Sequence, residues 1–386
     1  MDTGNSGQRE LSVDDLFQGT TFLPDTESSR FDVLLERVSR NRYTTFTVLY
    51  AELFRLFPDS PHLAVFFEQA VNLILLEPQE QHPIINDPIF QIWQGLTFRH
   101  TNLVLTEKSE ETGELEKLLI GFPDMLARVK AKDTSRLIHD CPPVYRFDVD
   151  PLIAMAVPPS YKFPEDEATR KQLERDGHPV RFFSDIVSIA LLRIEHTWPA
   201  CHERFKKLVK AICYLPDGSF RSCSASRYTG VILLSSRDNS ILDLEESLVH
   251  EATHQLLYYI VEMCPVIEEV ASREASFTLP WSGQKRDLYG YFHAFYVYIA
   301  LVKYLERVRS RSSEELQRAQ NRLAFIMRGL IRALPDLQAS GDFTPQGRQL
   351  LENLAKEVRA LESKHAGLMT KTAPATVPER ALDATA

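Results

Sequence analysis

The segment 243–263 constrains the fold of this chain most, because it combines helical apolar spacing with two histidines one turn apart. Asp243 can cap the start of a helix, and Glu246 stands three residues later in the arrangement of a capping box. His250 and His254 are four residues apart, so both imidazoles project from one face of that helix. We therefore expect a half-buried helix that carries both imidazoles on the same side.

Two imidazoles placed in this way can chelate one divalent metal ion. The run His250-Glu251-Ala252-Thr253-His254 has the HExxH pattern, in which the glutamate lies next to the first ligand and close to a metal-bound water. The alternative is an ordinary helix that carries two histidines by chance. Burying an imidazole without a partner costs free energy, so the apolar neighbours of this run favour a metal site.

A third ligand is required, and the sequence offers two candidates. Glu274 follows the helix and would complete a His/His/Glu site of the kind found in metalloproteases, although most glutamates are solvated surface acids. His293 stands near the start of an apolar helical stretch, where the alternative is a core histidine bonded to a backbone carbonyl. The residues alone leave both candidates open.

The rest of the chain predicts an α+β fold that is mostly α-helical, with a small β-sheet preceding the metal-binding HExxH helix. Apolar residues recur at helical spacing over 31–76, where Pro58 and Pro61 break the pattern, and over 114–130, 184–196 and 199–210. Two apolar runs, 211–215 and 230–234, predict neighbouring strands. Beyond Gly290 the chain is expected to be helical to about 332 and again over 346–364.

Composition predicts four parts along the chain. Residues 1–28 are polar and rich in Gly, Ser, Thr and Asp, which predicts a flexible N-terminal arm. A helical N-terminal region is expected over 29–140 and a metal-binding catalytic domain over 141–370. Their junction is rich in proline, so we expect extended chain there, with a short β-type run at Val144–Phe147. Residues 371–386 predict a disordered tail.

Charge and cysteine usage argue against several classes of protein. The formal net charge is −9, so the chain lacks the basic balance expected of a nucleic-acid-binding protein. Five cysteines without CxxC spacing argue against a disulfide framework and favour a cytoplasmic location. Residues 1–11 lack the apolar core of a signal peptide, and His293 and Lys303 interrupt the most apolar late stretch, so no membrane partner is expected.

Two blocks of sequence resemble the HExxH-motif domain family that is associated with peptide modification. One block is 248–257, which contains the HExxH run, and the other is Trp281 followed by 286–295. The family's second block is expected to read Arg-x-Leu-x-Gly-x-x-His, and the residues from Arg286 to His293 supply that pattern. Asp287 stands where proline is expected, and Ala294 where glycine is expected. The resemblance covers about residues 225–310.

The family contains 2-oxoglutarate-dependent iron oxygenases that hydroxylate peptides or amino acids. The resemblance therefore implies that His250, His254 and His293 hold iron(II), and that Arg286 pairs with a carboxylate of 2-oxoglutarate. Glu251 would then orient a ligand or a water. It predicts a dioxygenase whose partner is a peptide or amino-acid substrate.

Two alternatives come from other classes. One is a zinc metallopeptidase, with Glu251 as general base and Glu274 as third ligand. The other is a metal-stabilised binding protein without catalysis. It is less favoured, because a structural site normally closes its coordination shell with four protein ligands.

Overall fold

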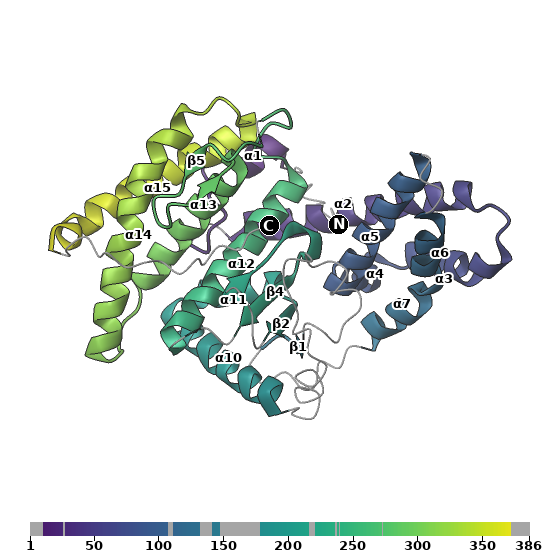
Figure 1. Ribbon diagram of the computed structural model, residues 1–386, viewed down its shortest axis with the longest axis horizontal. Helices are drawn as coiled ribbons and strands as arrows, with labels where there is room; N and C mark the ends of the chain where they lie inside the picture. The colour runs from purple at the N-terminus through teal and green to yellow at the C-terminus, as the bar shows by residue number, and fades with distance from the viewer. Residues whose placement is uncertain are drawn as a thin grey trace, which may run out of the picture.

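The computed structural model describes residues 11–25, 28–106, 111–131, 141–146, 178–215, 221–235, 238, 240–271 and 273–371. Over these residues the chain is mostly helical and carries two small sheets (Figure 1), which confirms the predicted α+β class. The larger sheet has the strand order β1-β2-β4-β3. The strands are β1 Val144–Arg146, β2 Ala211–Leu215, β3 Ser222–Cys223 and β4 Val231–Ser235.

The two predicted strands are neighbours in this sheet, and they run parallel. β2 pairs in parallel with β1 on one side and with β4 on the other, whereas β3 pairs antiparallel with β4. Parallel neighbours cannot be joined by a tight turn, so the segment between β2 and β4 must return along the sheet, and β3 forms on that return. All five residues of β4 are buried, as expected of a strand covered on both faces.

The two faces of the sheet belong to two different hydrophobic cores. Successive side chains of a strand point to opposite faces. One face packs with the C-terminal helices, and the other packs with the N-terminal helices. The first face carries Ile212, Tyr214, Ile232 and Leu234, and the second carries Ala211, Cys213, Val231 and Leu233. The predicted boundary at residue 140 therefore does not separate two independent cores, because the N-terminal helices need the sheet to close theirs.

The N-terminal helices begin and end close to the predicted breaks. They are α2 Ser28–Leu56, η1 Pro61–Leu63, α3 Ala64–Ile74, α4 Pro78–Ile85, α5 Pro88–Leu105, α6 Thr112–Ile120 and α7 Phe122–Lys130. The break at Pro58 and Pro61 is thus confirmed, and the helical stretch predicted over 114–130 is divided at Gly121 into α6 and α7. The start of α2 packs in the C-terminal core and its end packs in the N-terminal core, so this helix joins the two parts seen in Figure 1.

The flexible N-terminal arm predicted for 1–28 is wrong for residues 11–25. Helix α1 (Val13–Phe17) begins with a capping box between Ser12 and Asp15, and Phe17 is fully buried. The amide of Asn353 donates hydrogen bonds to the carbonyls of Phe17 and Thr20, and these bonds hold the segment against the C-terminal helix α15 (Pro345–Lys371). The Ser12–Asp15 pair was the overlooked signal in the sequence. Residues 1–10, and the predicted tail beyond Lys371, lie outside the described residues.

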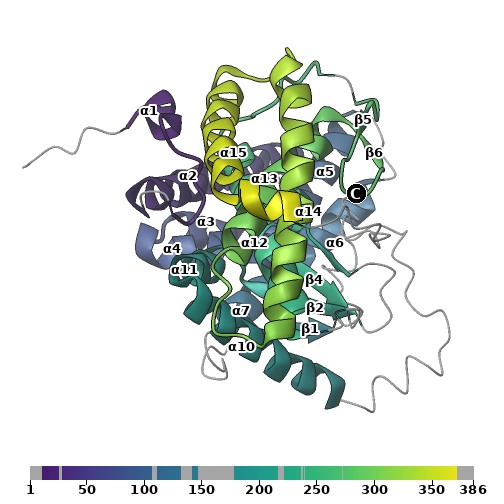
Figure 2. The ribbon, with the colours of Figure 1, turned by 90° about the vertical axis from the view of Figure 1, so that its left-hand side faces the viewer.

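The C-terminal half surrounds one central helix, α12 (Ile241–Met263), which contacts the sheet, α2, α10, α11 and α13. The other helices are α10 His178–Thr197, α11 Pro199–Leu208, η5 Ser226–Tyr228, α13 Leu288–Leu305, α14 Ser313–Ala339 and α15 Pro345–Lys371. A second small sheet pairs β5 (Phe277–Thr278) with β6 (Lys285–Arg286). Figure 2 shows α14 and α15 as long helices on the outside of α13.

The N-cap of α12 differs from the prediction. Ser240, and not Asp243, caps the helix, since its hydroxyl accepts a hydrogen bond from the backbone N–H of Asp243. Asp243 instead occupies the third helical position, where its carboxylate accepts a hydrogen bond from the Ser240 hydroxyl.

Among the helices that the structure describes, none is long and apolar enough to cross a bilayer.

One side chain fixes α12 on the sheet. Gln255 is fully buried; its amide nitrogen donates to the carbonyl of Val231, and its amide oxygen accepts from the N–H of Gly230. Gly230 adopts a positive φ of 90° directly before β4 begins. The helix is thus hydrogen-bonded to the start of the strand that it covers.

We expect Gln255→Leu to lower the free energy of unfolding by about 2–4 kcal/mol, because it leaves two buried backbone groups without partners while keeping the side-chain volume. Urea denaturation followed by circular dichroism measures this. Gln317→Leu is the matched control, since Gln317 is exposed and bonds only its helix neighbour Asn321. Equal loss in the two variants would contradict this account of Gln255.

Candidate metal centre

Three histidines meet in the interior between α12 and α13. α12 presents His250 and His254 from one face, as their spacing predicts, and His293 comes from the second turn of α13. Their exposed fractions are 1%, 1% and 3%. Imidazoles are rarely buried together without a reason, because each carries polar nitrogens that lose water.

The first two imidazoles stand at a separation that suits one shared ion. Nε2 of His250 lies 3.2 Å from Nε2 of His254. Two nitrogen ligands that each lie about 2.0–2.1 Å from one tetrahedral ion are about 3.3 Å apart. The pair therefore fits a divalent metal ion without movement of the backbone.

The His293 ring lies next to that of His254, but its nitrogens do not face the Nε2 atoms of the pair. Its Nδ1 lies 3.5 Å from Nδ1 of His254, while its Nε2 is buried and has no hydrogen-bond partner among the residues that the structure describes. An ion shared by the two Nε2 atoms of α12 can bind His293 only after an imidazole rotates. Within the described ranges, no three His, Cys, Asp or Glu side chains already stand in the arrangement of a metal site.

Burial keeps these imidazoles in the form that binds metals. It lowers the pKa of His293 to about 3. Burial, together with the neighbouring His250 and His293, also lowers the pKa of His254 well below its usual value. Both rings are therefore neutral at pH 7, and a neutral imidazole has a lone pair to offer a metal ion.

Glu251 is held beside the histidines by the end of β3. Its carboxylate is buried and accepts a hydrogen bond of 2.7 Å from the Ser224 hydroxyl. The backbone carbonyl of Ser224 in turn accepts a 3.0 Å hydrogen bond from the phenol of Tyr258. Ser224 thus connects the carboxylate of the HExxH run to a tyrosine one turn beyond His254.

Aromatic rings enclose the histidines on two sides. Tyr298 lies with its ring centroid 5.9 Å from that of His250 and is backed by Trp281 at 4.3 Å. On the other side, the rings of Tyr258 and Tyr289 lie 5.4 and 4.1 Å from His293. These rings exclude water and restrict how the imidazoles can turn.

The second block of the resemblance has clear structural roles. Asp287, where the family has proline, caps α13 by accepting a hydrogen bond from the N–H of Gly290. A Cβ on Gly290 would stand 3.2 Å from Cδ of Arg286, so the glycine leaves room for the stem of that arginine. Trp281 packs against Gly329, where a Cβ would lie 1.9 Å from the indole nitrogen.

The remaining sequence candidates are more exposed than the three histidines. Arg286 is half-buried on β6, and its guanidinium donates to the side chain of Gln284. Glu274 is exposed in the loop before β5, whereas the three histidines are buried. The structure therefore brings together His250, Glu251, His254 and His293, and leaves Glu274 at the surface.

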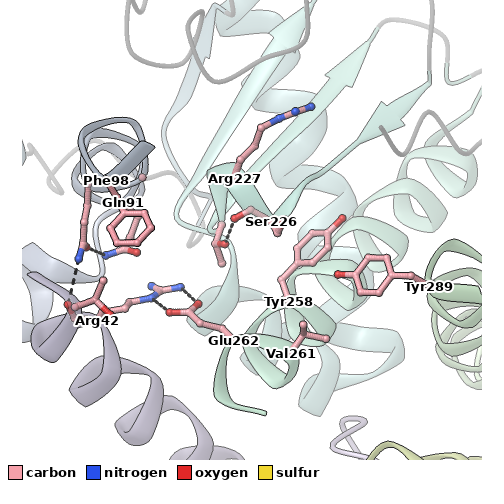
Figure 3. A pocket seen from close by; sticks show the side chains of 13 residues that line it. Arg42, Gln91, Phe98, Ser226, Arg227, Tyr258, Val261, Glu262 and Tyr289 are labelled. Carbon is pink, nitrogen blue, oxygen red and sulfur yellow. Dashed lines mark hydrogen bonds and ion pairs between the residues drawn. The ribbon is translucent and has the colours of Figure 1, made fainter. Parts of the chain in front are cut away.

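Two tyrosines and a pocket beside the histidines were not predicted from the sequence. Tyr258 follows His254 by one helical turn, and Tyr289 precedes His293 by one turn, so helical spacing could have identified both. They also line a pocket of about 410 Å³ (Figure 3). The pocket escaped notice because its other wall comes from α2 and α5, far away in the sequence.

Comparison with known proteins identifies no relative. No protein-family model matches this chain, and no curated protein matches it.

Replacement of Ser224 tests whether the hydrogen bond from its hydroxyl stabilises the buried carboxylate of Glu251. We expect Ser224→Ala to lower the free energy of unfolding by about 1–3 kcal/mol, because a buried carboxylate loses a charge-assisted hydrogen bond. Thr97→Val is the control: that hydroxyl is also buried but bonds a carbonyl of its own helix, so its loss costs less than about 1 kcal/mol. Chemical denaturation of both variants measures the difference, and equal values would refute a special role for Ser224.

Proposed function

We propose that this protein is an iron(II)- and 2-oxoglutarate-dependent dioxygenase that hydroxylates a peptide or amino-acid side chain. The observation that carries the proposal is the buried pair His250 and His254, whose Nε2 atoms are 3.2 Å apart with His293 beside them. Three protein ligands would leave coordination positions open for a 2-oxoacid and dioxygen. The resemblance of residues 225–310 to HExxH-type hydroxylases supports this choice of chemistry.

Each residue of the centre has a role in this proposal. His250 and His254 hold the ion, and His293, whose Nε2 has no hydrogen-bond partner among the described residues, offers a further nitrogen. Glu251, fixed by Ser224, orients a ligand or a water. Burial raises the pKa of Tyr289 to about 12, so its phenol stays protonated beside His293. Bound together, iron(II) and 2-oxoglutarate would activate dioxygen, the oxidant: one oxygen atom would enter succinate as 2-oxoglutarate loses CO₂, and the other would hydroxylate the C–H bond of the substrate.

Arg286 is the candidate that pairs with a carboxylate of 2-oxoglutarate. It stands on β6 directly before α13, the helix that carries His293. Its stem lies against Gly290 in the first turn of α13, so it stands beside the helix that carries His293. A guanidinium binds a carboxylate through two parallel hydrogen bonds, so the residue type suits the role.

The position of Glu274 favours the hydroxylase over the zinc peptidase. A peptidase of this kind needs a carboxylate as third ligand beside the two histidines. Glu274 is exposed, while His293 lies within 3.5 Å of His254. Histidine as third ligand thus requires a ring rotation, whereas Glu274 would have to leave the surface.

Reconstitution with iron(II) under anaerobic conditions tests the proposal. We expect the protein to retain one iron per chain and to convert 2-oxoglutarate to succinate when oxygen is admitted. His254→Gln removes a ligand and should weaken metal binding by more than about 100-fold, since even indirect partners of a metal ligand contribute 10–100-fold. His196→Gln is the control, because His196 is exposed on α10. Tight zinc without succinate formation would refute the proposal.

The third ligand is tested by two further variants. We expect His293→Ala to abolish succinate formation and Glu274→Ala to leave it unchanged, because the buried imidazole and not the exposed carboxylate lies beside the pair on α12. Metal analysis and the succinate assay give both readouts. The reverse pattern, with zinc-dependent peptide cleavage that requires Glu274, would establish the peptidase instead.

A further inference from the structure

The pocket described above lies between the N-terminal helices and the metal helix. Its volume is about 410 Å³, which is the size of a site for one or two amino-acid side chains. Gln91 and Phe98 of α5 line one side, and Tyr258 and Tyr289 line the other (Figure 3). It is therefore assembled from both halves of the chain.

The pocket and the histidine centre share a wall. Tyr258 and Tyr289 line the pocket, and the same two rings lie 5.4 and 4.1 Å from the ring of His293. Tyr258 is also stacked with His254 at 6.1 Å. One layer of aromatic rings thus separates a ligand in the pocket from the imidazoles. Rotation of a tyrosine side chain would open a path through this layer.

The charges around the pocket select the class of ligand. Arg42 is buried and forms a bidentate ion pair with Glu262, with both nitrogen–oxygen distances at 2.7 Å, so its charge is compensated. Arg227, at the exposed end of the lining, pairs with no carboxylate among the described residues. The lining therefore has one uncompensated positive charge at its exposed rim, where Figure 3 shows the Arg227 side chain extending away from the rings of Phe98 and Tyr258.

We propose that this pocket binds the substrate of the histidine centre, and that the substrate is a peptide segment with a carboxylate beside an apolar side chain. The carboxylate pairs with Arg227, whose guanidinium can accept it through two hydrogen bonds. The apolar side chain packs on the aromatic wall. The inference rests on the proposed function, because it assigns the substrate class of the same centre.

Two blocked dipeptides test the recognition directly. N-acetyl-phenylalanyl-aspartate amide carries the carboxylate, and N-acetyl-phenylalanyl-asparagine amide is its neutral match. We expect the acidic peptide to bind at least about tenfold more tightly in calorimetry, as one charge-assisted hydrogen bond predicts. Arg227→Gln should remove this preference, whereas Arg309→Gln, at an exposed position outside the pocket, should keep it.

A second variant fills the pocket without disturbing the fold. Gly95 lies on α5 in the lining, and a Cβ there meets no atom within 4 Å. Gly95→Leu should therefore preserve or raise stability, since leucine favours helix more than glycine does, while it abolishes binding of the acidic peptide. Gly113→Leu on α6 is the control, because Gly113 also has open space but lies outside the pocket.

The titrations are done with a chelator present, so that binding is measured without turnover. Equal affinity for the two dipeptides, or acid preference that survives both Arg227→Gln and Gly95→Leu, would overturn the inference. Displacement of the acidic dipeptide by 2-oxoglutarate at similar concentration would also overturn it, because the pocket would then hold the cosubstrate. If the protein binds the acidic dipeptide selectively but retains no metal, the proposed function alone is refuted. If it forms succinate but binds the two dipeptides equally, this inference alone is refuted.

Discussion

The burial of α12 on all sides is the constraint on which the rest of the structure depends. From Leu242 to Ile260 nearly every residue of this helix is buried, although many of its side chains are polar. A buried polar group without a partner costs more than a hydrogen bond contributes, so each neighbouring element must supply one. Arg311 and the phenol of Tyr304 meet the carboxylate of Glu245, and Arg322 meets that of Glu246.

The same requirement identifies the histidines as the exceptional part of α12. Glu251 has its hydroxyl donor, and Gln255 has two backbone partners. His250 and His254 instead face each other, and the nearest ring beyond them is another imidazole, that of His293. Because burial lowers the pKa of His254 and His293, these two rings are neutral, and contacts between neutral imidazoles are weak in comparison with bonds to a cation. A shared metal ion would give the buried imidazole nitrogens a bonding partner, as the other buried polar side chains of α12 already have.

Sequence pattern predicted the parts of the structure that depend on local chemistry. Proline and glycine breaks located the helices, and the spacing of His250 and His254 predicted their common face. The pattern failed where long-range packing decides: an apolar run does not reveal that β2 and β4 are parallel, and α1 is ordered by Asn353 in a distant helix. The pocket combines α5 with α12, so no local spacing could predict it.

The division of the sheet between two cores explains why the N-terminal helices matter to the centre. They close over the face of the sheet opposite α12, yet α2 also reaches the end of that helix through the ion pair of Arg42 with Glu262. The Arg42 side chain is 3% exposed, so removal of Glu262 would leave a buried guanidinium without its carboxylate. The ion pair joins α2 to α12, and Gln94 of α5 donates a hydrogen bond to the backbone carbonyl of Arg42. The α5 wall of the cavity beside the histidines is thereby linked through α2 to the helix that carries Tyr258.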